Sequence, residues 1–202
     1  MHIRAPAIVC ANRPHGETAG IVRLLTADHG MVAGYVAGAR GRTLRPVLIP
    51  GNLVDAELRS RSASQLPFAR LELVQSRGPW LSEPLPAAAI SWTTALAAAT
   101  LPERQPYPAL YEALAALLEA VCVAPSARRW AVPLLSFEVL LLRELGYGLS
   151  ARRPDESDWP AFLAAFDALG RQLERYPLAE RRSDVMAARA MLRSRLARIE
   201  GG

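Results

Sequence analysis

The sequence predicts a β + α protein, in which a small five-stranded barrel at the N-terminus is followed by an all-helical domain. Two observations predict this division. Up to about residue 80, apolar and polar residues alternate with period two between Gly, Pro, Asn and Asp, as in short antiparallel strands. Beyond that point the apolar residues recur with the spacing of helices. We therefore expect two domains, at residues 1–80 and 81–202.

Five segments of the N-terminal part have the pattern of strands, and they cover residues 4–11, 18–26, 31–39, 52–60 and 68–75. The second and third are joined by a short hairpin turn that ends at Gly30, since glycine readily adopts the positive φ that such turns need. Five short strands with a long Gly/Arg-rich connection after the third fit a barrel of the OB type. An SH3-like barrel is the main alternative.

The C-terminal part contains five segments with the pattern of helices. An Ala-rich segment, 84–102, comes first, and a second helix begins near Pro106 and Pro108. Residues 130–145 are apolar nearly all round, which predicts a helix at the centre of the bundle that stops at Gly146. Two further helices are predicted at 157–173, capped by Ser157 or Asp158, and at 183–199, capped by Ser183.

Positive charge is concentrated at the N-terminus. All 24 basic residues are arginine, and the net charge is +5. Residues 1–80 carry 10 Arg and five acids, whereas residues 81–150 carry four Arg and six acids, and residues 151–202 carry 10 Arg and eight acids. This distribution is typical of a module that binds a polyanion.

The usual catalytic motifs are missing from the sequence. It contains no phosphate-binding G-x-x-x-x-G-K-[ST], no H-E-x-x-H and no G-x-S-x-G. The histidines His2, His15 and His29 have no metal-ligand spacing, and Cys10 and Cys122 form no C-x-x-C pair. We therefore expect no catalytic residue, no metal and no cofactor, and a reducing, cytoplasmic setting.

Four segments occur in a telling order along the chain: IVRLLTADHG at 21–30, VAGARGR at 36–42, LYEAL at 110–114 and FEVLLLRELGY at 137–147. Together they resemble one known family, the DNA repair protein RecO (recombination protein O) family, and the resemblance extends over about residues 4–150. Many members of that family place zinc-binding cysteines just after the Leu-Gly-Tyr stretch. This chain has no cysteine after Cys122, so we expect its zinc-binding element to be absent.

The resemblance implies an OB-fold domain followed by a helical domain in a non-enzymatic, cytoplasmic and nucleoid-associated recombination mediator. Members of the family bind single- and double-stranded DNA, anneal complementary strands and assist recombinase loading in the repair of gaps and double-strand breaks. The partners implied are RecR and the acidic C-terminal tail of single-stranded DNA-binding protein.

The arginines of the N-terminal part are the candidate DNA-binding residues. Three of them, Arg40, Arg42 and Arg45, lie in one Gly-containing loop, where guanidinium groups can contact phosphates. Six others could extend the path around the barrel: Arg4, Arg13, Arg23, Arg59, Arg61 and Arg70. Aromatic platforms are scarce, the candidates being Tyr35, Phe68 and Trp80, and Phe68 is expected in the barrel core. Binding through phosphate electrostatics is therefore favoured over base stacking.

Three arginines near the central apolar helix, Arg128, Arg129 and Arg143, are candidates for binding an acidic peptide with an aromatic end. They could equally be helix-end arginines that complement the carbonyl ends of helices. On the last helix, Arg189, Arg193 and Arg195 are expected to form a solvated face.

Two rival functions stay open at this stage. The chain could be a protein-interaction adaptor whose barrel binds another protein, with no direct DNA role. A nuclease or nucleotidyl transferase would need clustered acidic residues to hold a metal, and the sequence shows no such cluster.

Overall fold

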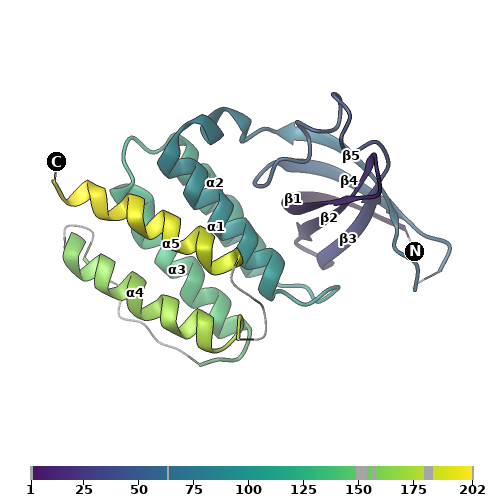
Figure 1. Ribbon diagram of the computed structural model, residues 1–202. Coiled ribbons are helices and arrows are strands. Elements are labelled where there is room, and N and C mark those ends of the chain that lie inside the picture. The colour runs from purple at the N-terminus through teal and green to yellow at the C-terminus, as the bar shows by residue number, and fades with distance from the viewer. Residues whose placement is uncertain (1, 63, 149–153, 156–157, 180–183, 202) are drawn as a thin grey trace.

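The computed structural model describes the chain apart from residues 1, 63, 149–153, 156–157, 180–183 and 202, and apart from the side chains of residues 184, 200 and 201. A β-barrel forms one end of the molecule and five α-helices form the other (Figure 1). The change of periodicity near residue 80 therefore marks a real change from strands to helices.

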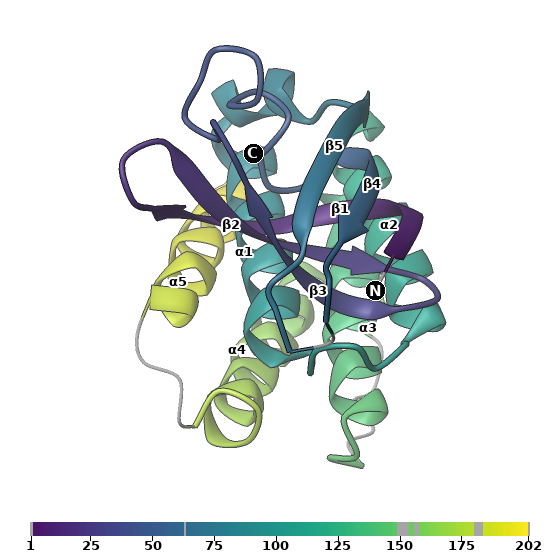
Figure 2. The same ribbon diagram turned by 90° about the vertical axis from the view of Figure 1, so that its right-hand side faces the viewer.

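The five predicted strands are confirmed, and they are β1 (His2–His15), β2 (Ala19–Thr26), β3 (Gly30–Val36), β4 (Leu53–Arg59) and β5 (Phe68–Gln75). They close a barrel in the order β1-β2-β3-β5-β4. The long strand β1 pairs with β4 through its first half and with β2 through its second, and its register shifts between Val9 and Ala11. Strands β3 and β5 close the barrel through one parallel pair, Tyr35 and Phe68. In Figure 2 the barrel lies in front of the helices.

The barrel has its own apolar interior, because alternate residues of each strand point inward. All five strands contribute to it, and the largest strand members are Ile3, Val9, Val22, Leu24, Val32, Val36, Val54, Leu58 and Leu71. Leu48 of the loop between β3 and β4 also belongs to this interior. The hairpin turn between β2 and β3 is confirmed, with Gly30 at φ +66°. A Cβ at this glycine would also collide with the backbone of Gln105, so the position needs glycine for two reasons.

The helical part begins with a 3₁₀ turn, η1 (Gly78–Ser82), and ends with another, η2 (Arg198–Gly201). Between them lie α1 (Pro84–Thr100), α2 (Pro108–Val123), α3 (Arg128–Glu144), α4 (Trp159–Arg175) and α5 (Asp184–Ala197). None of the helices in the described residues is long and apolar enough to cross a membrane.

Two of the predicted signals at helix ends are confirmed, although α3 begins two residues before and α4 ends two residues after the predicted bounds. The Asp158 carboxylate accepts a hydrogen bond from the Ala161 N–H at 2.9 Å, which confirms the predicted cap of α4. Gly146 follows α3 with φ +85°, as expected of a helix stop. The other two predicted caps, Ser157 and Ser183, lie outside the described residues.

The barrel and the helices are packed against each other. Four residues on the outer surface of the barrel, Ile8, Cys10, Leu25 and Met31, belong to the apolar core of the helical part. Helices α1 and α2 face the barrel there. Because this side of the barrel is covered, a ligand of the barrel must use the remaining surface.

The centre of the helical bundle holds a buried ion pair. Glu138 of α3 is 0% exposed, and its Oε2 lies 2.8 Å from Nη2 of Arg189 on α5. Its Oε1 accepts a hydrogen bond from Nε1 of Trp92 on α1 at 2.7 Å. Burial raises the pKa of Glu138, and the Arg189 guanidinium opposes that rise. The pair thus joins α1, α3 and α5 at one point.

The prediction that Arg189 is part of a solvated face is wrong, because Arg189 is only 4% exposed. Its Nη2 also donates to the Phe166 carbonyl oxygen of α4 at 2.7 Å, and its guanidinium lies 3.6 Å from the centre of the Phe166 ring. A Cβ at Gly170 of α4 would collide with this guanidinium, which explains a glycine in the middle of a helix.

Candidate nucleic-acid interface

The loop between β3 and β4 carries the three clustered arginines, and it is held against the barrel at two points. The Arg40 N–H donates to the Thr18 carbonyl oxygen at 3.2 Å, and Nη1 of Arg40 donates to the Glu17 carbonyl oxygen at 3.0 Å. At the other end of the loop, Nδ2 of Asn52 donates to the carbonyl oxygens of Pro46 at 2.8 Å and Val47 at 3.0 Å. The loop is therefore fixed beside the turn between β1 and β2.

Arg42 and Arg45 extend from this loop into solvent. Both are exposed, and neither guanidinium has an ion-pair or hydrogen-bond partner in the part of the chain that the structure describes. Tight local turns shape the loop, including the hydrogen bond from the Arg45 N–H to the Gly41 carbonyl oxygen at 3.0 Å. A phosphate could bind these two groups without first breaking an ion pair.

Five of the other candidate arginines lie on the barrel surface. All five are exposed: Arg4, Arg13, Arg59, Arg61 and Arg70. Of these, Arg70 is paired with Glu72 at 3.8 Å. Arg59 donates to Glu57 through Nε at 3.0 Å, and this hydrogen bond, with a second from His2, lowers the pKa of Glu57. Exposed pairs of this kind are worth at most about 1 kcal/mol, so an arginine can leave them for a phosphate.

Arg23 is placed apart from the others. Its Nη1 lies 3.3 Å from Oε1 of Glu103, and its Nη2 donates to the Leu101 carbonyl oxygen at 3.4 Å. Both partners belong to the connection between α1 and α2, and the Arg23 side chain is only 24% exposed. The structure thus turns Arg23 toward the helical part.

The prediction that Phe68 lies in the barrel core is wrong. Phe68 lies on the barrel surface and is 65% exposed. It contacts Tyr35 edge to face, with 5.2 Å between the ring centres, and Tyr35 in turn contacts His15 at 6.0 Å. Trp80 is separate from this row, because it lines a groove beside the helices.

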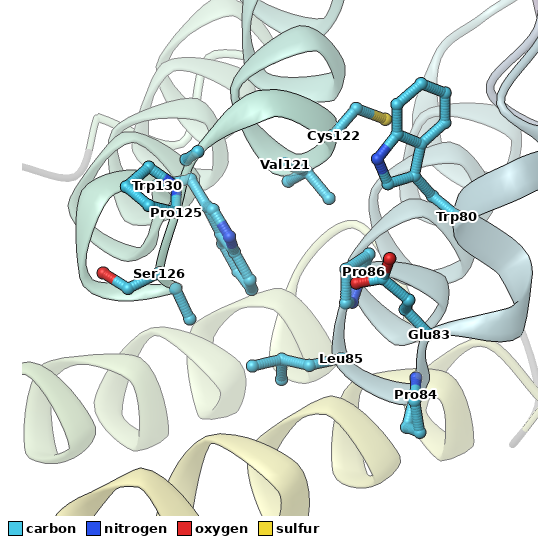
Figure 3. Close-up of a pocket in the computed structure, with 12 residues that line it drawn as sticks. Trp80, Glu83, Pro84, Leu85, Pro86, Val121, Cys122, Pro125, Ser126 and Trp130 are labelled. Carbon is cyan, nitrogen blue, oxygen red and sulfur yellow. The ribbon is translucent and has the colours of Figure 1, made fainter.

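That groove, of about 490 Å³, lies between the start of α1 and the connection from α2 to α3 (Figure 3). Its apolar walls are formed by Trp80, Leu85, Pro86, Val121, Pro125 and Trp130, and Glu83 and Cys122 also line it. Ala127 and Trp130 at the start of α3 line the groove. Arg128 and Arg129 lie between these two residues in the sequence.

The three candidate peptide-binding arginines are not brought together. Arg128 lies over the Trp159 ring at 4.9 Å, and Arg129 is exposed beside it in sequence at the start of α3. Arg143 is at the other end of α3, paired with Glu144 at 3.7 Å. Fifteen residues of helix separate Arg128 from Arg143, which is roughly 22 Å along the axis.

Arg77 and Asn52 were missed by the sequence analysis. Arg77 is 4% exposed, its Nη1 lies 2.7 Å from Oε2 of Glu119 on α2, and its N–H donates to Oδ1 of Asn52 at 2.7 Å. The Arg77 guanidinium lowers the pKa of Glu119. Asn52 thus braces both the basic loop and the junction of barrel and helices. No sequence signal distinguishes Arg77 from the exposed arginines, because it follows the last strand in a polar segment.

The possible metal ligands and the two thiols are the remaining groups of interest in the described residues. They contain no group of three or more His, Cys, Asp or Glu side chains that could hold a metal ion. The segment 149–153, where zinc-binding cysteines would follow Tyr147, lies outside them. Both cysteines are free and buried, and burial raises the pKa of Cys10 to about 12, so its thiolate is not available as a nucleophile.

Comparison with known proteins gives the family. Residues 1–77 match the model for the recombination protein O N-terminal region, and residues 82–175 match that for its C-terminal region. The DNA repair protein RecO of Rhodospirillum centenum is 45% identical over 144 residues, which is 71% of this chain and 56% of that protein. The RecO of Phenylobacterium zucineum is 42% identical over 151 residues, or 74% of this chain and 60% of that protein.

The chain belongs to the RecO family. It spans about three fifths of the length of the relatives that it matches.

Proposed function

We propose that this chain is a recombination mediator that binds single- and double-stranded DNA through its barrel, anneals complementary strands and assists recombinase loading during repair. It acts in this proposal without catalysis. The observation that carries the proposal is the anchored loop with Arg40, Arg42 and Arg45, two of whose guanidinium groups extend unpaired into solvent among the described residues. Its membership of the RecO family supports the same reading.

The barrel is, in this proposal, an OB-type domain that ends near residue 80. Its closed strand order, β1-β2-β3-β5-β4, and its long loop after β3 are consistent with that type. Guanidinium groups fork onto phosphate oxygens and release condensed counterions, so binding draws on the backbone of DNA rather than on its sequence. Annealing follows from the same physics, because neutralised strands no longer repel each other.

A footprint by hydrogen exchange tests where DNA binds. With an unlabelled single-stranded oligonucleotide, we expect slower exchange of the backbone N–H groups at residues 16–18 and 38–45, which lie in the turn and the loop joined by Arg40. Helices α4 and α5 serve as the internal control and should not change. If exchange is the same with and without oligonucleotide, the alternative of a protein-interaction adaptor with no direct DNA role is favoured.

We further propose RecR as a partner, and that the groove of Figure 3 receives the acidic C-terminal tail of single-stranded DNA-binding protein. Two tryptophans in the walls suit an aromatic peptide end, and the exposed Arg129, which lies in sequence between the lining residues Ala127 and Trp130, suits its acidic residues. Arg128, next to it in sequence, would have to leave the Trp159 ring to contribute. Arg143 lies at the other end of α3 from Arg128 and Arg129, so we do not expect it to contact the same peptide end.

Isothermal calorimetry with that tail peptide tests the groove. We expect Arg129→Gln to weaken binding several-fold, because it removes one exposed charge from the rim. Arg143→Gln is the matched control at the far end of the same helix and should bind as the unchanged protein does. Absence of heat at high micromolar peptide, or equal effects of the two substitutions, would contradict this part of the proposal.

A further inference from the structure

A row of aromatic side chains crosses the outer surface of the barrel. Ile21 of β2 pairs with Tyr35 of β3, and Tyr35 pairs with Phe68 of β5. Directly paired residues in a sheet have their side chains on the same face, and the edge-to-face contact of Tyr35 with Phe68 agrees with that placement. His15 extends the row through its contact with Tyr35. Strands β3 and β5 lie on the side of the barrel away from the helices (Figure 2).

Arginines continue the row at both ends. Arg13 of β1 pairs with Ile21, and Arg59 of β4 pairs with Phe68. Across the five strands, the side chains on this face are therefore, in order, Arg13, Ile21, Tyr35, Phe68 and Arg59. Arg13 and Arg59 are both exposed. His15 lies two residues beyond Arg13 on the same strand, just before the turn that holds Arg40. The aromatic row is therefore continuous with the basic loop.

An ordinary structural role does not account for Phe68. Its ring is 65% exposed, so it adds little to the barrel core, which other residues of the strands already fill. A single exposed apolar residue is common on protein surfaces. Three rings in contact, with guanidinium groups at both ends, instead combine the two features that unpaired nucleic acid requires, a π face for bases and positive charge for phosphates.

We propose that His15, Tyr35 and Phe68 form a base-stacking platform for an unpaired DNA strand, whose phosphates are held by Arg13 and Arg59 on either side. This inference rests on the proposed DNA binding and deepens it, because it names unpaired bases as ligands. The exposed arginines on either side of the rings complement the negative phosphates of a nucleic acid, which favours a DNA strand over an uncharged ligand. A duplex cannot use the platform, because the faces of its bases are stacked on one another. The platform thus favours single strands without reading their sequence.

The test compares two ligands of equal charge, a thymidine oligonucleotide and an abasic oligomer of the same length. The unchanged protein is expected to bind the thymidine oligonucleotide about tenfold more tightly, since base stacking on one ring is worth about that factor. Phe68→Ala should remove most of this preference while leaving the affinity for the abasic oligomer and the salt dependence unaltered. Phe68→Trp should retain the preference.

Val74→Ala is the matched control, because Val74 is another exposed apolar residue of β5, 55% exposed, and has no part in the row. It should behave as the unchanged protein. Equal affinity of the unchanged protein for the two ligands would overturn the platform while leaving phosphate binding intact. An equal loss on both ligands in Phe68→Ala would overturn it as well. Binding to neither ligand would overturn both the platform and the proposed function.

Discussion

Glu138→Ala is expected to lower the free energy of unfolding by about 3–5 kcal/mol, because removing one partner of a buried ion pair leaves the other charge unpaired. Glu138 is 0% exposed and is the carboxylate that both Arg189 and the Trp92 indole N–H contact. Without it, the Arg189 guanidinium retains only the Phe166 carbonyl oxygen among the acceptors found for it in the described residues. The loss is therefore larger than that of any exposed ion pair.

Urea denaturation followed by circular dichroism measures this effect. Glu112→Ala, which removes an exposed carboxylate from α2, is the control and should change stability by less than about 0.5 kcal/mol. The double substitution Glu138→Leu with Arg189→Met should recover much of the loss, since apolar replacements of buried pairs are often neutral or stabilising. A loss below about 1 kcal/mol in Glu138→Ala would show that the pair does not hold the bundle together.

Replacing Arg40, Arg42 and Arg45 together by Gln is expected to weaken binding to single-stranded DNA about a hundredfold at low salt, since three phosphate contacts are lost. The slope of log K against log salt should become shallower by about 2, because each contact to a single strand contributes about 0.7. Fluorescence anisotropy with a thymidine oligonucleotide over a series of salt concentrations measures both quantities.

The control for this variant has the same change in net charge. Arg171, Arg175 and Arg198 are exposed on the helical part, and replacing them together by Gln also removes three positive charges. This control should keep both the affinity and the slope nearly unchanged, because those residues lie outside the barrel. Similar losses in the two triple variants would mean that binding responds to net charge alone and not to the loop.

Local patterns in the sequence were enough to predict most of the fold. The five strands and the hairpin at Gly30 follow from period-two alternation and from the backbone freedom of glycine. The cap at Asp158 and the stop at Gly146 follow from the chemistry of helix ends. Each of these signals is carried by a few neighbouring residues, so tertiary contacts did not need to be known. That the three arginines share one connection also followed from their spacing, whereas its anchoring to the turn between β1 and β2 did not.

Three residues could not be placed from the sequence, because partners far along the chain determine their positions. Arg189 appears on the helix as one of a stripe of arginines, and only the packing of α3 and α4 against α5 brings Glu138 and Phe166 to it. Arg77 is buried and paired with Glu119, 42 residues away. Phe68 looks like a core residue because it starts an alternating strand, yet its register with Tyr35 puts it on the outer face.

The central claim is that guanidinium groups gathered on one surface of the barrel bind a polyphosphate. It is tested most directly by titrating the unchanged protein with one single-stranded oligonucleotide at 50 mM and at 200 mM salt. With at least three phosphate contacts, the affinity is predicted to fall about tenfold or more between these concentrations. Equal affinity at both concentrations, or no binding at either, would contradict the claim.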